Sequence, residues 1–213
     1  MGLTQHRNSV ATIREVVNLL LLGGNIGRPG AGACPVRGHS NVQGDRTMGI
    51  YEKPTEAFLT RLDEAMGITS SRAPGLDVVD TITAMQRGRV GVFMTLGGNF
   101  ASATPDTEAT EIALGQVGLT VHVSTKLNRS HAVPGVESLI LPSLGRSDTD
   151  VQAGARQFVT VEDSMSVVHR SQGSLRPPGE DVLSEPVIVA EIAHRLLAGN
   201  PIDWLGAAAD YDR

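Results

Sequence analysis

The chain has 213 residues, 40% hydrophobic content and a formal net charge of −5; this is enough apolar material for a sizeable core and too little charge for a disordered chain. The slightly acidic balance gives no basic surface for nucleic acid or an anionic membrane, and 3% aromatic residues argue against base stacking. A single cysteine excludes an intramolecular disulfide framework and any cluster or zinc site that needs several thiolates. No secretory leader and no apolar run of membrane-spanning length is visible, so we expect the cytoplasm and no membrane span.

The first third of the chain predicts a helix followed by a long glycine-rich loop. Over residues 9–22 apolar side chains recur at helical spacing, with Ser9 as the expected N-cap and Gly23 as the stop. Residues 23–49 carry many glycines and no period, so we expect them to lack secondary structure. An irregular stretch of this length is uncommon unless it serves a function.

The middle third predicts alternating helices and strands. Helical patterns cover 55–66 and 78–87, with Asp77 as a cap for the second. The apolar run 90–96 predicts a strand buried on both faces, and the next strand follows at 119–123. Between these strands, Thr104 as N-cap and Pro105 as the first helical residue predict a helix to about residue 116. This order indicates a right-handed βαβ unit with parallel strands.

The last third predicts strands at 138–141, 157–161 and 167–168, a helix at 186–197 and a frayed tail. The expected fold class is therefore α/β. We expect a Rossmann-like layered domain with a parallel sheet flanked by helices, preceded by a helix and a long glycine-rich loop. The predicted domains are residues 1–50, with the helix and loop, residues 51–200, an α/β cofactor-binding domain, and residues 201–213, the tail.

Polar and glycine residues follow two neighbouring strands of this predicted sheet. Gly97-Gly98-Asn99 comes after the first strand and Ser124-Thr125-Lys126 after the second. Parallel strands end at one edge of a sheet, where such folds bind ligands, and these residue types suit a phosphate and a nucleoside. The alternative is an ordinary glycine turn and an ordinary polar loop, both of which are common after strands.

The glycine-rich loop carries Arg37 and His39 close to the single cysteine, Cys34. A guanidinium in such a loop suits bidentate binding of a small carboxylate or phosphate, and a nearby imidazole can exchange protons near neutral pH. On its own, this pattern is explained better by a surface arginine that bonds loop carbonyls than by a ligand-binding one. We expect Cys34 to be a packed thiol, and the other histidines lack zinc-type spacing, so no protein-only metal site is predicted.

Blocks spread over residues 2 to about 173 resemble the molybdopterin-dependent oxidoreductases, and among them the formate dehydrogenase-like alpha subunits. The resemblance is carried by GLTQH at residues 2–6, LLLLGGNIGRPGAGACPVRGHSNVQGDRTMG, LGGNF, STKLNRSH and LILPSLGR. It implies a molybdenum or tungsten ion held by two molybdopterin guanine dinucleotides, and two-electron redox of a small substrate such as formate.

The resemblance also implies roles for individual residues. Arg37 matches the arginine that orients the formate carboxylate, and His39 lies at an adjacent active-site position. The remaining matched positions imply cofactor contacts: Gln5, His6, Gly97, Gly98, Asn99, Ser124, Thr125, Lys126, Pro142 and Ser143.

Several parts of the family pattern are absent from this sequence. Relatives in this family begin with a cysteine-rich segment for a 4Fe–4S cluster, supply a metal ligand early, and end with a separate barrel; Met1-Gly2 coincides with an internal Met-Gly of the pattern. We therefore expect a central fragment, from a split or truncated frame or an excised piece, whose partners are the missing domains or a companion chain. Alone it should be inactive, bind neither metal nor cofactor tightly, and expose apolar surface. The alternative function is a non-catalytic nucleotide-binding or assembly module.

Overall fold

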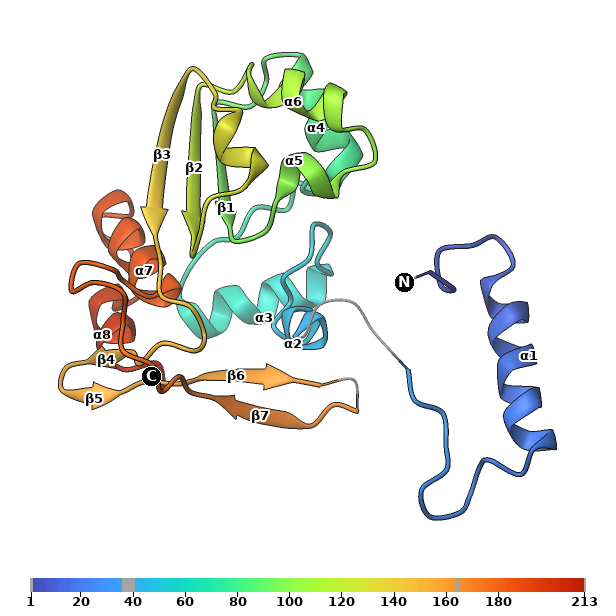
Figure 1. Cartoon of the computed structure of the whole chain (residues 1–213). Coiled ribbons are helices and arrows are strands. Elements are labelled where there is room, and N and C mark those ends of the chain that lie inside the picture. Colours follow the sequence, from blue (N-terminus) through green and yellow to red (C-terminus); the bar gives the residue numbers. More distant parts are fainter. Residues whose placement is uncertain (1, 36–40, 164, 213) are drawn as a thin grey trace. The chain divides into compact units, whose positions relative to one another are not determined.

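The computed structural model describes residues 2–35, 41–163 and 165–212 (Figure 1). The chain divides into two compact units, Met1–Met48 with Val161–His169, and Gly49–Thr160 with Arg170–Arg213, each described by itself below. Among the described residues, no helix is both long and apolar enough to cross a bilayer.

The first unit contains helix α1, Ser9–Leu22, as predicted. The predicted N-cap at Ser9 is wrong by one residue. Asn8 holds the capping position with non-helical backbone angles but without a side-chain bond, and Ser9 is the first helical residue. No residue of α1 is buried, so its apolar stripe is exposed.

The first unit also contains a short helix, α2, Val42–Thr47, in a stretch that was expected to lack secondary structure. Before α2, Asn41 adopts a left-handed backbone with φ of 67°, and its Oδ1 accepts a hydrogen bond from Glu162 N at 2.9 Å. At the other end of the helix, Thr47 donates to Glu162 Oε2 at 2.7 Å. Six residues are too few to show a helical period, and this helix depends on contacts with residues far along the chain.

The second unit begins with α3, Glu56–Met66, and α4, Val78–Gln86. Thr55 caps α3 by accepting from Phe58 N, and Asp77 caps α4 by accepting from Val79 N and Asp80 N. α4 thus begins where the sequence predicts and α3 begins one residue later, with Thr55 as its cap. In both helices a side-chain oxygen satisfies amides that lack an intrahelical partner.

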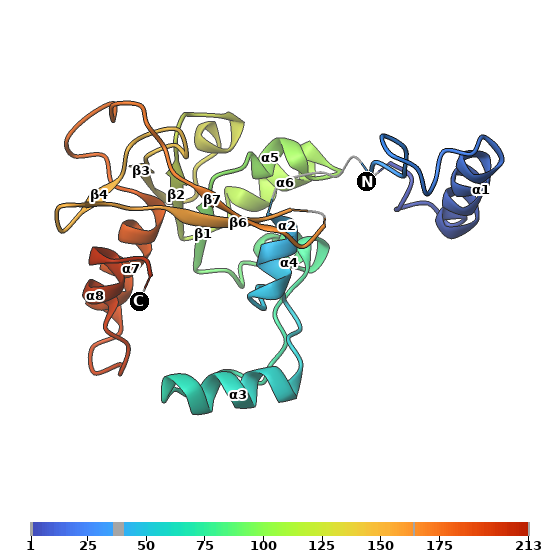
Figure 2. The same cartoon turned by 90° about the horizontal axis from the view of Figure 1, so that it is seen from below.

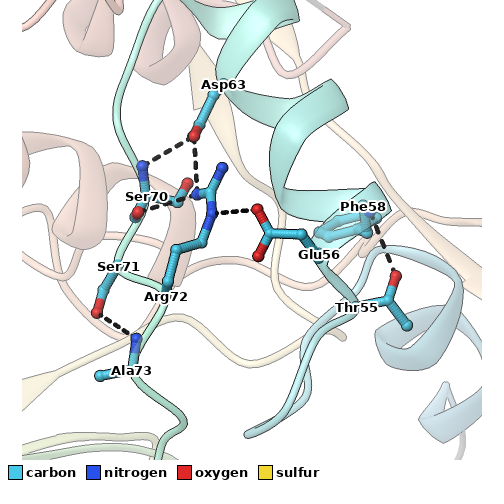
Figure 3. Close-up of polar contacts among 8 residues, drawn as sticks. All are labelled: Thr55, Glu56, Phe58, Asp63, Ser70, Ser71, Arg72 and Ala73. Carbon is cyan, nitrogen blue, oxygen red and sulfur yellow. Dashed lines mark hydrogen bonds and ion pairs between the residues drawn. The ribbon is translucent and has the colours of Figure 1, made fainter.

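The segment between α3 and α4 is attached to α3 by Arg72. Its guanidinium bonds Glu56 and Asp63, each at 2.8 Å, and Asp63 also accepts from Ser70 N (Figure 3). Hydrogen bonding from Ser70, with a further contribution from Arg72, lowers the pKa of Asp63 below its usual value. This polar cluster is structural and contains none of the predicted site residues.

Three parallel strands form the sheet of the second unit: β1 (Val92–Leu96), β2 (Leu119–Ser124) and β3 (Glu137–Pro142), in the order β1-β2-β3. Met94 is aligned with Val121, and Val121 with Leu139. Helices flank this sheet, so the predicted α/β class with a parallel sheet is confirmed. The arrowheads of all three strands reach the same edge (Figure 1).

The connection between β1 and β2 contains two helices, α5 (Phe100–Ala103) and α6 (Thr107–Leu114), where one helix was expected, with Thr104 as N-cap and Pro105 as its first residue. Asp106 is the N-cap of α6 and accepts from Ala109 N. The hydroxyl of Thr104 is instead hydrogen-bonded to that of Thr110 at 2.7 Å in the interior. Thr104 therefore serves the packing of α6, and Pro105 precedes the helix.

A core of small and aliphatic side chains joins these helices to one face of the sheet. Phe93 of β1 packs against it and stacks at a tilt on Phe100, with the ring centroids 4.9 Å apart. The buried members of this core are Met85, Ala101, Ala113, Leu114 and Val117.

The prediction that the first strand is buried on both faces is wrong. Along β1, exposed and partly buried residues alternate, with Val92 62% and Leu96 51% exposed. Central residues of β2 are buried instead. The reason is that Phe93 packs on the core, whereas Val92, Met94 and Leu96 on the opposite face of β1 stay exposed, so only one face of this strand is covered by the described residues.

Beyond β2, a 3₁₀ turn, η1 (Arg129–Ala132), leads to β3, and the last third adds two small sheets. These sheets consist of β4 (Val151–Gln152) with β5 (Ala155–Arg156), and of β6 (Val159–Glu162) with β7 (Val168–Ser171). The predicted strands at 157–161 and 167–168 correspond to β6 and β7, shifted toward the C-terminus.

Two helices end the chain, α7 (Glu185–Leu196) and α8 (Trp204–Ala209). The expectation of a frayed tail is wrong. Both views show α8 beside α7 (Figure 1, Figure 2), and Ala208 packs with Val187 and Ala190 in a second small core. Tyr211 then donates a hydrogen bond to Asp150 Oδ2 at 2.5 Å, which ties the tail to the loop after β3.

Candidate functional site

The turn after β1 brings bare backbone to the carboxyl edge of the sheet. Gly97 and Gly98 adopt φ values of 63° and 72°, which side chains other than glycine rarely tolerate. A Cβ added at either position would have no atom within 4 Å. Gly97 N donates to Val123 O at 2.7 Å, which fixes the start of the turn to β2. The turn is therefore open to a ligand that approaches the main chain closely.

The loop after β2 lies beside this turn. Ser124 donates its hydroxyl hydrogen to Lys126 O at 2.8 Å, which closes a tight turn and leaves Thr125 and Lys126 exposed. The lysine ammonium and the threonine hydroxyl can thus reach an anion from solvent.

The end of β3 completes the edge. Ser143 N donates to Ser124 O at 3.1 Å, so the second and third strand ends are joined through the main chain. The Ser143 side chain is 4% exposed, and among the described residues its hydroxyl has no hydrogen-bond partner. Buried hydroxyls are normally satisfied, so this one is a candidate for a ligand or ordered water. Pro142, the last residue of β3, is exposed.

The structure thus brings together eight of the predicted cofactor contacts at one edge, joined by two backbone hydrogen bonds: Gly97, Gly98, Asn99, Ser124, Thr125, Lys126, Pro142 and Ser143. It does not do this for the others. Gln5 and His6 are exposed in the turn before α1, in the other unit. Arg37 and His39 lie outside the described residues. Their assignments remain predictions.

Two functional candidates were missed from the sequence, Asn128 and Ser130. Asn128 Nδ2 donates to Gly98 O at 2.6 Å, and Ser130 Oγ donates to Asn99 Oδ1 at 3.2 Å. Both residues belong to the STKLNRSH block that carries part of the resemblance, but nothing in their spacing indicates that they reach back to the turn after β1.

Beneath this edge two imidazoles lie against each other in the interior. His122 of β2 has Nδ1 at 3.0 Å from Thr95 Oγ1, and its ring centroid is 4.8 Å from that of His131. Burial lowers the pKa of His122, and the His131 ring adds to this effect. A neutral imidazole is thus favoured at this position.

A small cavity of about 110 Å³ lies next to the edge, beyond Ser143. Its walls include Leu144, Asp150, Ser184, Glu185 and Tyr211. Such a volume is well below the ~300 Å³ at which ordinary ligand pockets begin. It cannot enclose a dinucleotide. The candidate site is the open edge because that edge carries the predicted contacts.

Two further findings concern metals and thiols. Cys34 is exposed, so the expectation of a packed thiol is wrong. Within residues 2–35, 41–163 and 165–212, no group of three or more His, Cys, Asp or Glu side chains is arranged to hold a metal ion.

The chain matches no family model, but it is similar to proteins named as oxidoreductases. A Mycobacterium tuberculosis protein named an uncharacterized oxidoreductase is 62% identical over 213 residues, which are all of this chain and 27% of the relative. Protein YdeP of Escherichia coli is 51% identical over the same 213 residues, 28% of its length. The Bacillus subtilis protein named "Putative formate dehydrogenase YrhE" is 28% identical over 204 residues, 92% of this chain and 20% of the relative. The chain therefore spans about a quarter of the length of the first two of these relatives. Homologues of this segment thus occur in larger proteins, one of which is named an oxidoreductase.

Proposed function

We propose that this chain forms part of the cofactor cleft of a molybdopterin-dependent oxidoreductase, with the carboxyl edge of β1–β3 binding a guanine dinucleotide. The observation that carries the proposal is the joined set of strand ends, in which open glycine backbone, an exposed lysine and a buried unpartnered serine hydroxyl meet. The names of two relatives, an uncharacterized oxidoreductase and a putative formate dehydrogenase, support the reaction class.

The residues of the edge fit such a group. Gly97 and Gly98 would let a pyrophosphate approach the main chain, because no side chain stands in the way. The Lys126 ammonium would offset phosphate charge from solvent, and the hydroxyls of Thr125 and Ser143 would bond ribose or base. When bound, the metal with its two pterin dithiolenes supplies two-electron redox chemistry.

The proposed substrate is formate or a similar small anion. Arg37 would bind its carboxylate through two parallel hydrogen bonds, and His39 would exchange a proton near neutral pH. These two roles rest on the sequence and its resemblance.

The rest of the proposed enzyme lies in polypeptide beyond this chain. Since the chain spans 27% and 28% of two of its relatives, we assign the 4Fe–4S cluster, the protein ligand of the metal and the other half of the cleft to that polypeptide. The proposed compartment is the cytoplasm.

The binding edge can be tested with guanosine diphosphate as the probe, titrated into the ¹⁵N-labelled chain. We expect chemical-shift changes at the amides of Gly97, Gly98, Asn99, Thr125 and Lys126. Lys126→Ala should weaken binding about three- to tenfold and reduce its salt dependence, since one charge-assisted contact is lost.

The matched control is Lys53→Ala, which removes another exposed lysine of the same unit. Chemical-shift changes confined to other surfaces, or equal losses of affinity in the two lysine variants, would count against binding at this edge.

The reaction class is tested separately. We expect neither stoichiometric molybdenum or tungsten nor formate-dependent dye reduction from this chain alone, and we expect one of the two metals in purified full-length YdeP. Formate-dependent dye reduction by the isolated chain, or by YdeP that contains neither metal, would contradict the proposal.

A further inference from the structure

We infer that Asn128 and Ser130 are positioning residues that hold the Gly97–Asn99 turn in its ligand-binding shape. This inference rests on the proposed function. It concerns two side chains that would not themselves bind the cofactor.

The turn needs external support. Two consecutive residues with positive φ are glycines, and glycine has more backbone freedom to lose than any other residue. Open space surrounds the Cβ positions of both, so packing does not hold them. Without other contacts, this turn would sample many conformations, and binding an anion would carry the free-energy cost of ordering it.

Hydrogen bonds from η1 and the residue before it supply that support from both sides of Asn99. Asn128 Nδ2 donates to Gly98 O at 2.6 Å. Ser130 Oγ donates to Asn99 Oδ1 at 3.2 Å and accepts from Ala101 N at 3.0 Å. With only 2% of Ser130 exposed, water competes weakly for its bonds. The Gly98 carbonyl oxygen, which would repel a phosphate, is kept occupied by an amide.

The supporting segment is itself fixed. Asn128 Oδ1 accepts from Ser130 N at 3.0 Å, and Asn128 N donates to His131 Nδ1 at 3.0 Å, a reciprocal cap of η1. His131 in turn lies against His122 of β2. Only Leu127 separates Lys126 from Asn128, so the loop that carries the candidate phosphate contact also holds the glycine turn.

The test uses Asn128→Ser and Ser130→Ala in the full chain. Serine is a good N-cap, so Asn128→Ser keeps an acceptor for Ser130 N but is too short to reach Gly98 O, and it adds no charge near an anion. The matched control is Asn200→Ser, which shortens an asparagine whose Oδ1 likewise accepts a local amide, that of Ile202.

The first readout needs no ligand. Amide hydrogen exchange at Ala101, which donates to Ser130 Oγ, and at Ala103, which donates to Asn99 O, should become at least about tenfold faster in both variants. The amides of Val121 and Val123 in β2 should keep their protection. The second readout is guanosine diphosphate affinity, which should fall about three- to tenfold in both variants and stay unchanged in Asn200→Ser.

The outcomes separate this inference from the proposed function. If wild type fails to bind the probe but exchange at the turn rises in the variants, the binding proposal fails and the positioning of the turn stands. If exchange at Ala101 and Ala103 is unchanged in Asn128→Ser, the positioning role is overturned whatever the affinity. If exchange rises equally in β2, the two residues stabilise the fold in general and the inference also fails.

Discussion

The buried side chain of His122 in β2 is expected to make the stability of the fold depend on pH. His122 is 2% exposed, and its Nε2 has no hydrogen-bond partner among the described residues. Burial, helped by His131, lowers its pKa below the usual 6.5. The unfolded chain therefore binds a proton at this residue at a higher pH than the folded chain does. The contribution to stability is complete above about pH 7 and is lost as the pH falls below 6.5.

We predict that the free energy of unfolding, measured by urea denaturation, falls between pH 7.5 and pH 5, and that His122→Asn removes part of this fall. Asparagine keeps a polar atom near Thr95 but does not titrate. His194→Asn, at an exposed position of α7, should retain the full dependence. An unchanged pH profile in His122→Asn would show that this imidazole is not responsible.

Residue patterns predicted the candidate site only in part. Glycines and a lysine after strands identify a sheet edge without any knowledge of distant contacts, since parallel strands end together. The support by Asn128 and Ser130 could not be predicted in this way, because it depends on hydrogen bonds to residues about 30 positions earlier. The same holds for the Ser143 hydroxyl, whose burial follows from packing.

At the scale of an element, the capping of α4 is the clearest prediction. Asp77 Oδ1 accepts from Val79 N at 3.0 Å and from Asp80 N at 2.9 Å. Asp77→Ala should lower the free energy of unfolding by about 1 kcal/mol, whereas Asp77→Ser should cost only a few tenths, because serine also caps. Equal losses in the two variants on urea denaturation would mean that the cap contributes nothing.

The hydroxyl of Tyr211 helps to hold the segment that follows α8. Tyr211 donates to Asp150 Oδ2 and accepts from Ser184 Oγ, both at 2.5 Å, and burial, with the Asp150 bond, raises the pKa of Tyr211. Tyr211→Phe keeps the ring but leaves a carboxylate with fewer donors. We expect a loss of about 1–2 kcal/mol and faster amide exchange in α8.

Tyr211→Ala should cost more than Tyr211→Phe, since the ring also packs on the core of α7 and α8. If Tyr211→Phe leaves the exchange of α8 unchanged, packing and the hydrogen bonds of Gln157 to Ala209 O and Tyr211 N hold the tail without this hydroxyl. This helix was missed from the sequence because six residues are too few to show a helical period, and its stability comes from tertiary contacts.

At the scale of the whole chain, the α/β class was predictable because two apolar runs joined by a helical pattern form a βαβ unit, which admits few topologies. The exposure of β1 was not. A continuous apolar run such as 90–96 is typical of a strand covered on both faces, yet what covers a face is decided by other segments. The apolar run 90–96 therefore indicates a covered second face, but the described residues do not cover it.

The uncovered residues of the sheet lead to the last prediction. Val92 and Met94 lie on the same face of β1, and the register places Leu139, 47% exposed, on that face of β3. Exposed apolar patches favour association. We expect the isolated chain to self-associate with rising concentration in sedimentation velocity. The double variant Val92→Thr with Leu139→Thr should weaken this association while changing the free energy of unfolding by less than about 1 kcal/mol, because threonine suits a strand and little burial is lost. Ile112→Thr removes an apolar side chain of similar exposure from α6 and should leave association unchanged; an equal effect from it would show that the sheet face has no special part.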